Sequence, residues 1–330
     1  MSAVYPWHAA VWRQISGQWH SLPHAWLFYG REHTGKTAFA RHFAQALLCE
    51  NLPPNRQPCG QCPSCRLFEH GSHPDFYPLA PDTPEEGGSR RLAQIKIDAV
   101  RAVLEPLNQS SVRGGRRVVL IAPADSLNVQ AANALLKILE EPPQAVVFLL
   151  AANQRERLLP TIRSRCRQMP LPLPAHAEAL AFLRQRGTDH AENLLAFHGG
   201  APLFEPQPEQ DALRETLLDI LAAPRLLAVL DFAAAFDKAK YPLALLLDWL
   251  GKWLADTARA QHGLPPHYYP ARAEACARAA AQSNPATLFR FQAALNRLAP
   301  YGHHSLNVRM QAEDLLCAYL LMLQKNKSVQ

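Results

Sequence analysis

The chain has 330 residues, of which 48% are hydrophobic and 19% are charged, and this composition excludes a mainly disordered protein and predicts two or three domains. The 34 Lys and Arg residues exceed the 28 Asp and Glu residues, and the net charge of +6 permits contact with a phosphate backbone without requiring it. No apolar run reaches the ~18 residues of a transmembrane helix, and the N-terminus lacks the basic start and apolar core of a signal peptide, so no membrane contact is expected.

The first half of the chain alternates between short apolar runs and stretches of helical periodicity. The expected strands are residues 24–29, 76–79, 117–122 and 146–151, and the expected helices are residues 36–48, 95–107 and 128–140. Strands that alternate with helices indicate a parallel sheet covered on both faces. Residues 81–90 are polar and rich in Gly and Pro, which predicts a mobile loop.

The second half has a different pattern. Prolines cluster at residues 170–174 and again at 202–208, and each cluster predicts a linker. Residues 175–203 can hold two or three short helices, and from residue 211 onward Ala and Leu recur at helical spacing. We therefore expect an α/β domain at residues 1–168, a small helical domain at 169–206 and an all-α domain at 207–330.

A glycine-rich loop lies between the first expected strand and the first expected helix. The segment GREHTGKT matches the phosphate-loop pattern G-x-x-x-x-G-K-[ST], whose glycines let backbone N–H groups face an anion. The lysine reaches the β- and γ-phosphates in such loops, and the Ser/Thr hydroxyl holds Mg²⁺. The candidate nucleotide contacts are Gly30, Thr34, Gly35, Lys36 and Thr37. The alternative is an ordinary turn with an exposed lysine.

Hydrolysis of a bound nucleotide also needs acidic side chains at the end of a neighbouring strand. The candidate strand at residues 117–122 runs into Ala122 and Pro123, where an Asp-Glu pair would stand. Asp125 follows three residues after Ala122 and is interpreted as a residue of the cap of the next helix. The sequence thus predicts a phosphate-binding loop without the usual catalytic acids.

Four cysteines with the spacing C-x9-C-x2-C-x2-C indicate a metal site. They are Cys49, Cys59, Cys62 and Cys65. Without a signal peptide the thiols are expected in a reducing cytoplasm, where metal binding is favoured over disulfides. Four thiolates suit a closed, structural Zn²⁺ site, and a metal would order a segment that has no core of its own. An iron–sulfur cluster and unligated thiols are the alternatives, and His70 and His73 are nearby alternative ligands.

Taken together, four segments resemble one family. HAWLFYGREHTGKT, the cysteine cluster, ADSLNVQAANALLKILEEPP and LLPTIRSRC look like the bacterial clamp-loader subunits of the AAA+ class, and the similar part runs from Tyr5 to Cys166. The gamma and tau motor subunits normally carry an Asp-Glu pair at the position of Ala122 and Pro123. The delta-prime subunits of DNA polymerase III typically lack this pair and are the closer resemblance. Some of them have a degenerate phosphate loop, whereas the loop of this chain is intact.

This resemblance implies an AAA+ domain with a zinc module at residues 49–65, a helical lid and a helical collar that joins other subunits. The implied partners are the gamma/tau and delta subunits of a hetero-pentamer, the sliding clamp, and primed DNA reached through the assembly. Arg165 of the SRC motif would act in trans in the nucleotide site of a neighbouring motor subunit. The implied cofactors are structural Zn²⁺ and ATP or ADP with Mg²⁺, in a subunit that is not an active ATPase by itself.

From the residues alone, several readings stay open. Arg163 and Arg165 could form a solvated basic turn, and Asn153 could be a polar nucleotide sensor. Four basic residues could face either DNA or solvent: Lys137, Arg113, Arg116 and Arg117. The intact phosphate loop also fits a working gamma/tau-like ATPase. A zinc-containing regulator that binds DNA alone is a third reading, and it predicts tight, base-specific binding by the monomer.

Overall fold

The computed structural model describes residues 4–82, 93–303 and 307–324. The chain divides into two compact units, each with its own hydrophobic core. Within the described residues, the first unit comprises residues 4–82, 93–179 and 201–203, and the second comprises 180–200, 204–303 and 307–324. The expected division into three domains at residues 168 and 206 stays a prediction beside this division into two.

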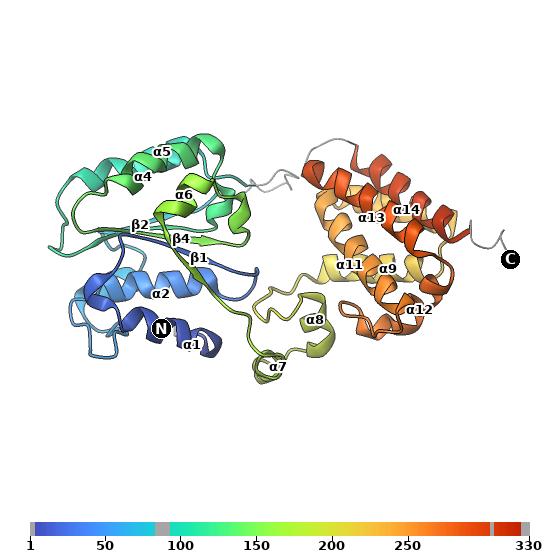
Figure 1. The fold of residues 1–330 in the computed structure, drawn as a ribbon, viewed down its shortest axis with the longest axis horizontal. Coiled ribbons are helices and arrows are strands. Elements are labelled where there is room, and N and C mark those ends of the chain that lie inside the picture. The colour runs from blue at the N-terminus through green and yellow to red at the C-terminus, as the bar shows by residue number, and fades with distance from the viewer. Residues whose placement is uncertain (1–3, 83–92, 304–306, 325–330) are drawn as a thin grey trace. The chain divides into compact units, whose positions relative to one another are not determined.

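The first unit is built on a parallel sheet of five strands in the order β2-β3-β4-β1-β5 (Figure 1). The strands are β1 (Ala25–Tyr29), β2 (Phe76–Leu79), β3 (Arg117–Ile121), β4 (Val146–Ala152) and β5 (Arg167–Pro170). In register, Leu27 of β1 lies beside Leu150 of β4, and Leu149 lies beside Leu120 of β3. Parallel strands share one carboxyl edge, so the loops that follow β1, β3 and β4 emerge side by side.

Helices cover both faces of this sheet (Figure 1). One face packs against α1 (Ala9–Ser16), α2 (Lys36–Leu48) and α3 (Pro63–Glu69), and the other against α4 (Ile97–Leu104), α5 (Val129–Glu140) and α6 (Pro160–Arg165). Because side chains alternate along a strand, Trp26 and Phe28 enter the first core while Leu27 enters the second. Burial on both faces explains why the central strands are continuously apolar.

In the described part of the second unit, all regular secondary structure is helical. Its helices, with α7 leading into it, are α7 (His176–Gln185), α8 (Ala191–Phe197), α9 (Pro208–Ala222), α10 (Leu226–Lys238), α11 (Leu243–Gln261), α12 (Ala273–Ala281), α13 (Pro285–Leu298) and α14 (Val308–Gln324). Trp253 of α11 donates through Nε1 to the Tyr319 hydroxyl at 2.9 Å, and that hydroxyl donates to the Leu221 carbonyl at 3.0 Å. The buried polar atoms of these two large aromatic side chains therefore have hydrogen-bond partners within the core of this unit.

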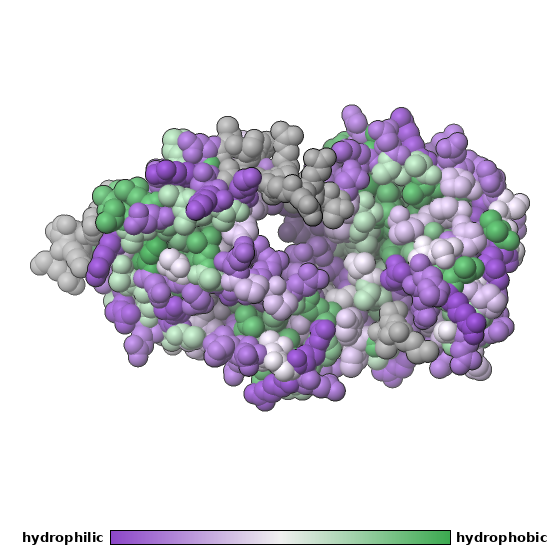
Figure 2. All heavy atoms as spheres, turned by 180° about the vertical axis from the view of Figure 1, so that it is seen from behind, coloured by the Kyte–Doolittle hydropathy of each residue, from purple (hydrophilic) through white to green (hydrophobic). Residues whose placement is uncertain are grey.

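Short 3-10 helices connect several of these elements. They are η1 (Pro6–His8), η2 (Trp19–Ser21), η3 (Glu105–Asn108), η4 (Ala124–Ser126), η5 (Arg155–Arg157), η6 (Pro270–Arg272) and η7 (Ala299–Tyr301). On the face drawn in Figure 2, hydrophilic residues cover most of the surface and hydrophobic residues are scattered among them. Among the described residues, no helix has the length and apolar character that crossing a bilayer requires.

The predicted α/β fold is confirmed, with its four expected strands present and the three expected helices close to their predicted ends. The sequence analysis missed α1, α3, α6 and β5. Strand β5 gives little strand signal, because among its four residues only Met169 is buried and its last residue, Pro170, begins the predicted linker at 170–174. The expected helix at 95–107 divides into α4 and η3. The predicted mobile loop at 81–90 lies almost wholly outside the described residues.

Candidate functional site

The candidate phosphate loop connects β1 to α2, as the sequence predicts, and two of its glycines are sterically required. Gly35 has φ +92°, and a Cβ there would lie 2.6 Å from the ring of Tyr5. Gly30 has φ +158°, and a Cβ there would lie 2.5 Å from the carbonyl oxygen of Leu171. Any larger residue at either position would have to displace a neighbour, so the loop conformation depends on glycine.

The interior of the loop is buried and internally bonded. Lys36 is 5% exposed, and its Nζ donates to the Arg31 carbonyl at 2.5 Å. Burial lowers the pKa of Lys36 to about 8, although Glu32 and Asp125 act in the opposite direction. Buried Thr34 donates to the same carbonyl at 2.8 Å, whereas Thr37 is exposed at the start of α2. A phosphate bound here would take the place of the Arg31 carbonyl as the partner of Lys36.

Two segments outside the motif close over the loop, and the sequence analysis missed both. Tyr5 stacks on Trp7 with ring centroids 4.8 Å apart, and Trp7 Nε1 donates to the Thr34 carbonyl at 2.9 Å. From the other side, Leu203 N donates to the His33 carbonyl at 3.0 Å. The aromatic residues before the first strand were the available signal, but no local pattern reveals a contact between residues 33 and 203.

The edge of the sheet beside the loop carries no acidic pair. Strand β3 continues into Ala122–Pro123, a cis peptide, and neither residue supplies a carboxylate. The Asp125 carboxylate accepts from the backbone N–H groups of Asn153 at 2.9 Å and Gln154 at 3.3 Å. It therefore ties η4 to the segment after β4 rather than capping a helix. The proposed sensor role of Asn153 stays a prediction.

The four candidate metal ligands converge. The Sγ atoms of Cys49, Cys59, Cys62 and Cys65 all lie within 4.8 Å of one another, and the thiols are not joined by disulfides. A tetrahedron with Zn–S bonds of about 2.3 Å has its sulfur atoms about 3.8 Å apart, and the Cys59 and Cys65 sulfurs are separated by 4.0 Å. The donor set and its spacing fit Zn²⁺, and neither His70 nor His73 belongs to the group.

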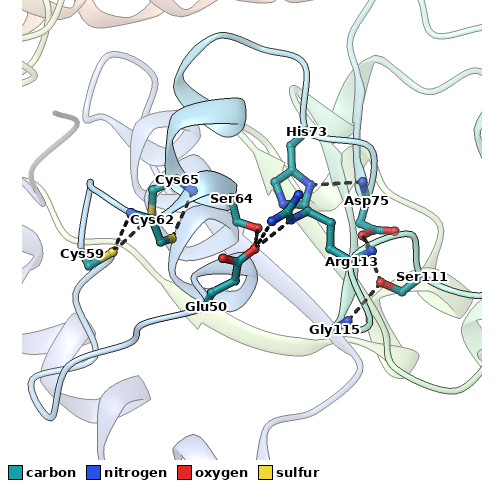
Figure 3. A network of polar contacts seen from close by, with 10 residues as sticks. All are labelled: Glu50, Cys59, Cys62, Ser64, Cys65, His73, Asp75, Ser111, Arg113 and Gly115. Atoms are coloured by element: carbon teal, nitrogen blue, oxygen red, sulfur yellow. Dashed lines mark hydrogen bonds and ion pairs between the residues drawn. The ribbon is translucent and has the colours of Figure 1, made fainter.

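Backbone N–H groups point at these sulfurs and hold the chain in a tight turn. Cys59 N lies 3.4 Å from Cys49 Sγ. Cys62 N lies 3.3 Å from Cys59 Sγ, and Cys65 N lies 3.4 Å from Cys62 Sγ (Figure 3). The backbone N–H of Gln61 contributes most to lowering the pKa of Cys59 to about 6, while burial raises the pKa of Cys65. The N–H groups thus stabilise thiolate, the form that binds a metal.

Arg165 ends α6 at the border of the core, as expected for an edge position. Its side chain is 30% exposed, and its guanidinium donates to the Thr161 carbonyl at 2.8 Å and forms an ion pair with Glu140, the last residue of α5. The next residue, Cys166, is buried, and this burial raises its thiol pKa to about 12. A buried anchor therefore follows directly after a partly exposed arginine.

Two of the basic residues left open by the sequence have partners within the chain. Arg117 is 6% exposed, and its guanidinium donates to the carbonyls of Leu107, Gln109 and Gln144. This arginine holds two loops against the start of β3 and is not presented to DNA. Arg113 pairs with Glu50 at 2.5 Å, and Lys137 is exposed on α5.

Comparison with known proteins identifies the family. A sequence model described as "DNA polymerase III, delta subunit" matches residues 9–174. The chain is 39% identical over 268 residues to "DNA polymerase III subunit delta'" of Pseudomonas aeruginosa, a match that covers 79% of each chain. The chain belongs to the delta-prime family of DNA polymerase III. The delta-prime subunit of Escherichia coli is 36% identical over 277 residues, covering 78% of this chain and 77% of that protein.

The gamma and tau subunits of DNA polymerase III match a smaller part of this chain. The tau subunit of Escherichia coli is 35% identical over 177 residues, which is 50% of this chain and 26% of that protein. Membership of the delta-prime family confirms the resemblance seen in the motifs.

Proposed function

We propose that this chain is the stator of a clamp loader in the cytoplasm, where it supports a hetero-pentamer with gamma/tau and delta subunits. The assembly would load the sliding clamp on primed DNA, and the helical second unit would act as the collar that joins the subunits. In this role the chain does not hydrolyse ATP. It supplies Arg165 to the nucleotide site of a neighbouring motor subunit.

One observation carries the proposal. The edge of the sheet that should hold catalytic acids has Ala122–Pro123 instead, while the SRC arginine is retained at the surface of α6. A chain with a nucleotide loop but no acids cannot position Mg²⁺ and water for hydrolysis in the usual way. A partly exposed guanidinium on a rigid helix is suited to stabilise charge on a γ-phosphate held by another subunit.

In the proposed mechanism, Arg165 only exchanges its hydrogen-bond and ion-pair partners. Its guanidinium would give up the Thr161 carbonyl and Glu140 and donate to phosphate oxygens of the neighbour's nucleotide. Arginines in this role contribute about 10³–10⁵ in rate. Buried Cys166 would keep the turn in place during the exchange.

Substitution of Arg165 tests the proposal directly. In a reconstituted clamp loader, Arg165→Ala should leave assembly intact and lower the DNA-stimulated ATPase rate. If every active motor site needs the arginine, the rate should fall by about 10³-fold. If only the neighbouring site needs it, the rate should fall by the fraction that this site contributes to the total. Arg163→Ala on the same helix is the matched control, because Arg163 forms no ion pair among the described residues. An ATPase rate that Arg165→Ala leaves unchanged would refute the stator role.

We further infer that the phosphate loop binds ATP or ADP with Mg²⁺ without turnover. The residues that would hold the phosphates and the ion are Gly30, Thr34, Gly35, Lys36 and Thr37. This inference is supported by the two sterically required glycines and by the buried lysine. The rival reading, a gamma/tau-like ATPase, rests on the same intact loop.

The isolated chain separates these two readings. We expect nucleotide binding that Lys36→Ala abolishes, together with no Lys36-dependent release of phosphate. Binding is measured by titration with a fluorescent nucleotide, and turnover by phosphate release. Robust hydrolysis by the wild-type chain that Lys36→Ala removes would assign the motor function instead.

The cysteine module would hold Zn²⁺ through Cys49, Cys59, Cys62 and Cys65 in a structural role. Their four sulfurs complete a tetrahedral shell and leave no position for a substrate. When bound, the ion supplies folding free energy to the segment around it rather than chemistry.

A further inference from the structure

We propose that the cysteine module positions the loop Ser111–Gly115, which enters β3, and that it does so through one carboxylate, Glu50. The observation is a set of polar contacts, drawn in Figure 3, that runs from Ser64 and Glu50, each next to a metal ligand in the chain, to this loop. This inference does not depend on the clamp-loader role. It rests only on the binding of a metal by the four cysteines.

Glu50 joins the two ends of the module. It directly follows the first ligand, Cys49, and its Oε1 accepts from the hydroxyl of Ser64 at 2.7 Å. Ser64 directly precedes the last ligand, Cys65, and is 1% exposed. The carboxylate and the hydroxyl can meet only while both ends of the module are folded together, and a shared metal ion is what would keep them so.

The same carboxylate oxygen reaches out of the module. Glu50 Oε1 accepts from Arg113 Nε at 2.8 Å and lies 2.5 Å from another nitrogen of that guanidinium. The two side chains are about one third exposed, with 32% for Arg113 and 35% for Glu50. Two nitrogens of the Arg113 guanidinium thus share one oxygen of Glu50, and this charge-assisted contact holds the end of the Arg113 side chain at the module.

The backbone of the loop is held from the opposite side. Asp75, which precedes β2 and is 1% exposed, accepts from Val112 N at 2.9 Å, Arg113 N at 3.0 Å and the Ser111 hydroxyl at 3.0 Å. That hydroxyl in turn accepts from Gly115 N at 3.1 Å. The loop is therefore anchored at its base by the sheet and at its tip by the module.

Because the loop is held at both places, the cysteine module can fix the position of its tip. Asp75 fixes the backbone at Val112 and Arg113, whereas Gly114 and Gly115 are exposed, and an added Cβ at either would meet no atom within 4 Å. With Glu50 in place the side chain of Arg113 has one direction, and the loop presents Val112, which is 73% exposed, in a fixed position. Without an ordered module, Glu50 loses Ser64 and the loop keeps only its base.

Hydrogen exchange on the full-length zinc-loaded chain tests this coupling. Amides of Ser111–Gly115 should exchange about two- to fivefold faster in Arg113→Gln, because an exposed ion pair of this kind shifts a local opening equilibrium by that factor. Arg116→Gln, one residue beyond the loop and without an ion pair among the described residues, is the control and should leave exchange unchanged. Metal analysis should show that both variants still hold one Zn²⁺.

Metal removal is the second arm. A chelator should speed exchange at Ser111–Gly115 in the wild type by a similar factor and add little in Arg113→Gln, because the contact is already broken. Unchanged exchange in Arg113→Gln, equal acceleration by the chelator in wild type and variant, or a chain that binds no metal would each overturn the proposal.

Discussion

His8 shows how a single buried side chain can set a pH dependence. The imidazole is fully buried, with its ring 5.5 Å from that of Phe39, and burial and then the charge of Lys36 lower its pKa to about 4. The unfolded chain binds a proton near pH 6.5, whereas the folded chain does not until about pH 4. The folded state is therefore favoured by a neutral ring, and stability falls as the pH drops through that window.

This histidine gives a prediction at the residue scale. The free energy of unfolding of the first unit should fall by up to about 1.4 kcal/mol per pH unit between pH 6.5 and 4, and His8→Leu should remove that part of the slope. The measurement is urea denaturation at a series of pH values. His262→Leu, at an exposed position, is the control. A slope that is the same in wild type and His8→Leu would contradict the assignment.

At the scale of elements, a buried carboxylate organises the segment after α11. Asp256 is fully buried and accepts four hydrogen bonds, from His267 N, from Tyr268 N to both oxygens, and from Tyr269 N, at 2.6–3.2 Å. Tyr269 then places its hydroxyl 3.2 Å from the Trp249 carbonyl. One side chain of a helix thus folds a loop that has little periodic structure of its own.

Removal of this carboxylate should loosen the whole element. We expect Asp256→Ala to lower the free energy of unfolding of the second unit by about 3 kcal/mol, because it leaves three N–H groups without their acceptor, of which that of Tyr269 is buried. Asp256→Asn keeps one carbonyl oxygen and should lose less. The check is denaturant unfolding followed by tryptophan fluorescence. Equal stability of Asp256→Ala and wild type would show that solvent satisfies these groups.

The elements also show what the sequence can and cannot reveal. The runs at 117–122 and 146–151 were predictable because both of their faces are buried, and α5 because its apolar residues recur at helical spacing. Strand β5 pairs with β1 alone and buries only Met169, so its sequence resembles a linker. The phosphate loop and the cysteine cluster could be recognised in the sequence because each is a local motif. The hydrogen bond between Leu203 and His33 and the ion pair between Arg113 and Glu50 could not be predicted from the sequence, since only tertiary folding brings these residues together.

At the scale of the whole molecule, the two units keep separate cores. Trp26, Phe28 and Phe43 lie in one core, and Trp249 and Trp253 lie in the other. Because the cores of the first unit are separate from the core of the second, two unfolding transitions are favoured instead of one. The cysteine module belongs to the first unit, so a bound metal should stabilise that unit alone.

A denaturant series read by hydrogen exchange tests this division. Chelation should lower the unfolding midpoint of peptides from the first unit and leave peptides from α9–α14 unchanged, whereas Asp256→Ala should do the reverse. Both units responding together to either change would show that they unfold as one cooperative body.

The residue that closes over the phosphate loop stands at a boundary of the chain. Leu203 donates to the His33 carbonyl, and the residue after it already belongs to the helical unit. A single peptide bond thus separates a residue that contacts the phosphate loop from the helical unit. A ligand that displaced Leu203 from the His33 carbonyl would therefore act on the residue next to Phe204, where the helical unit resumes.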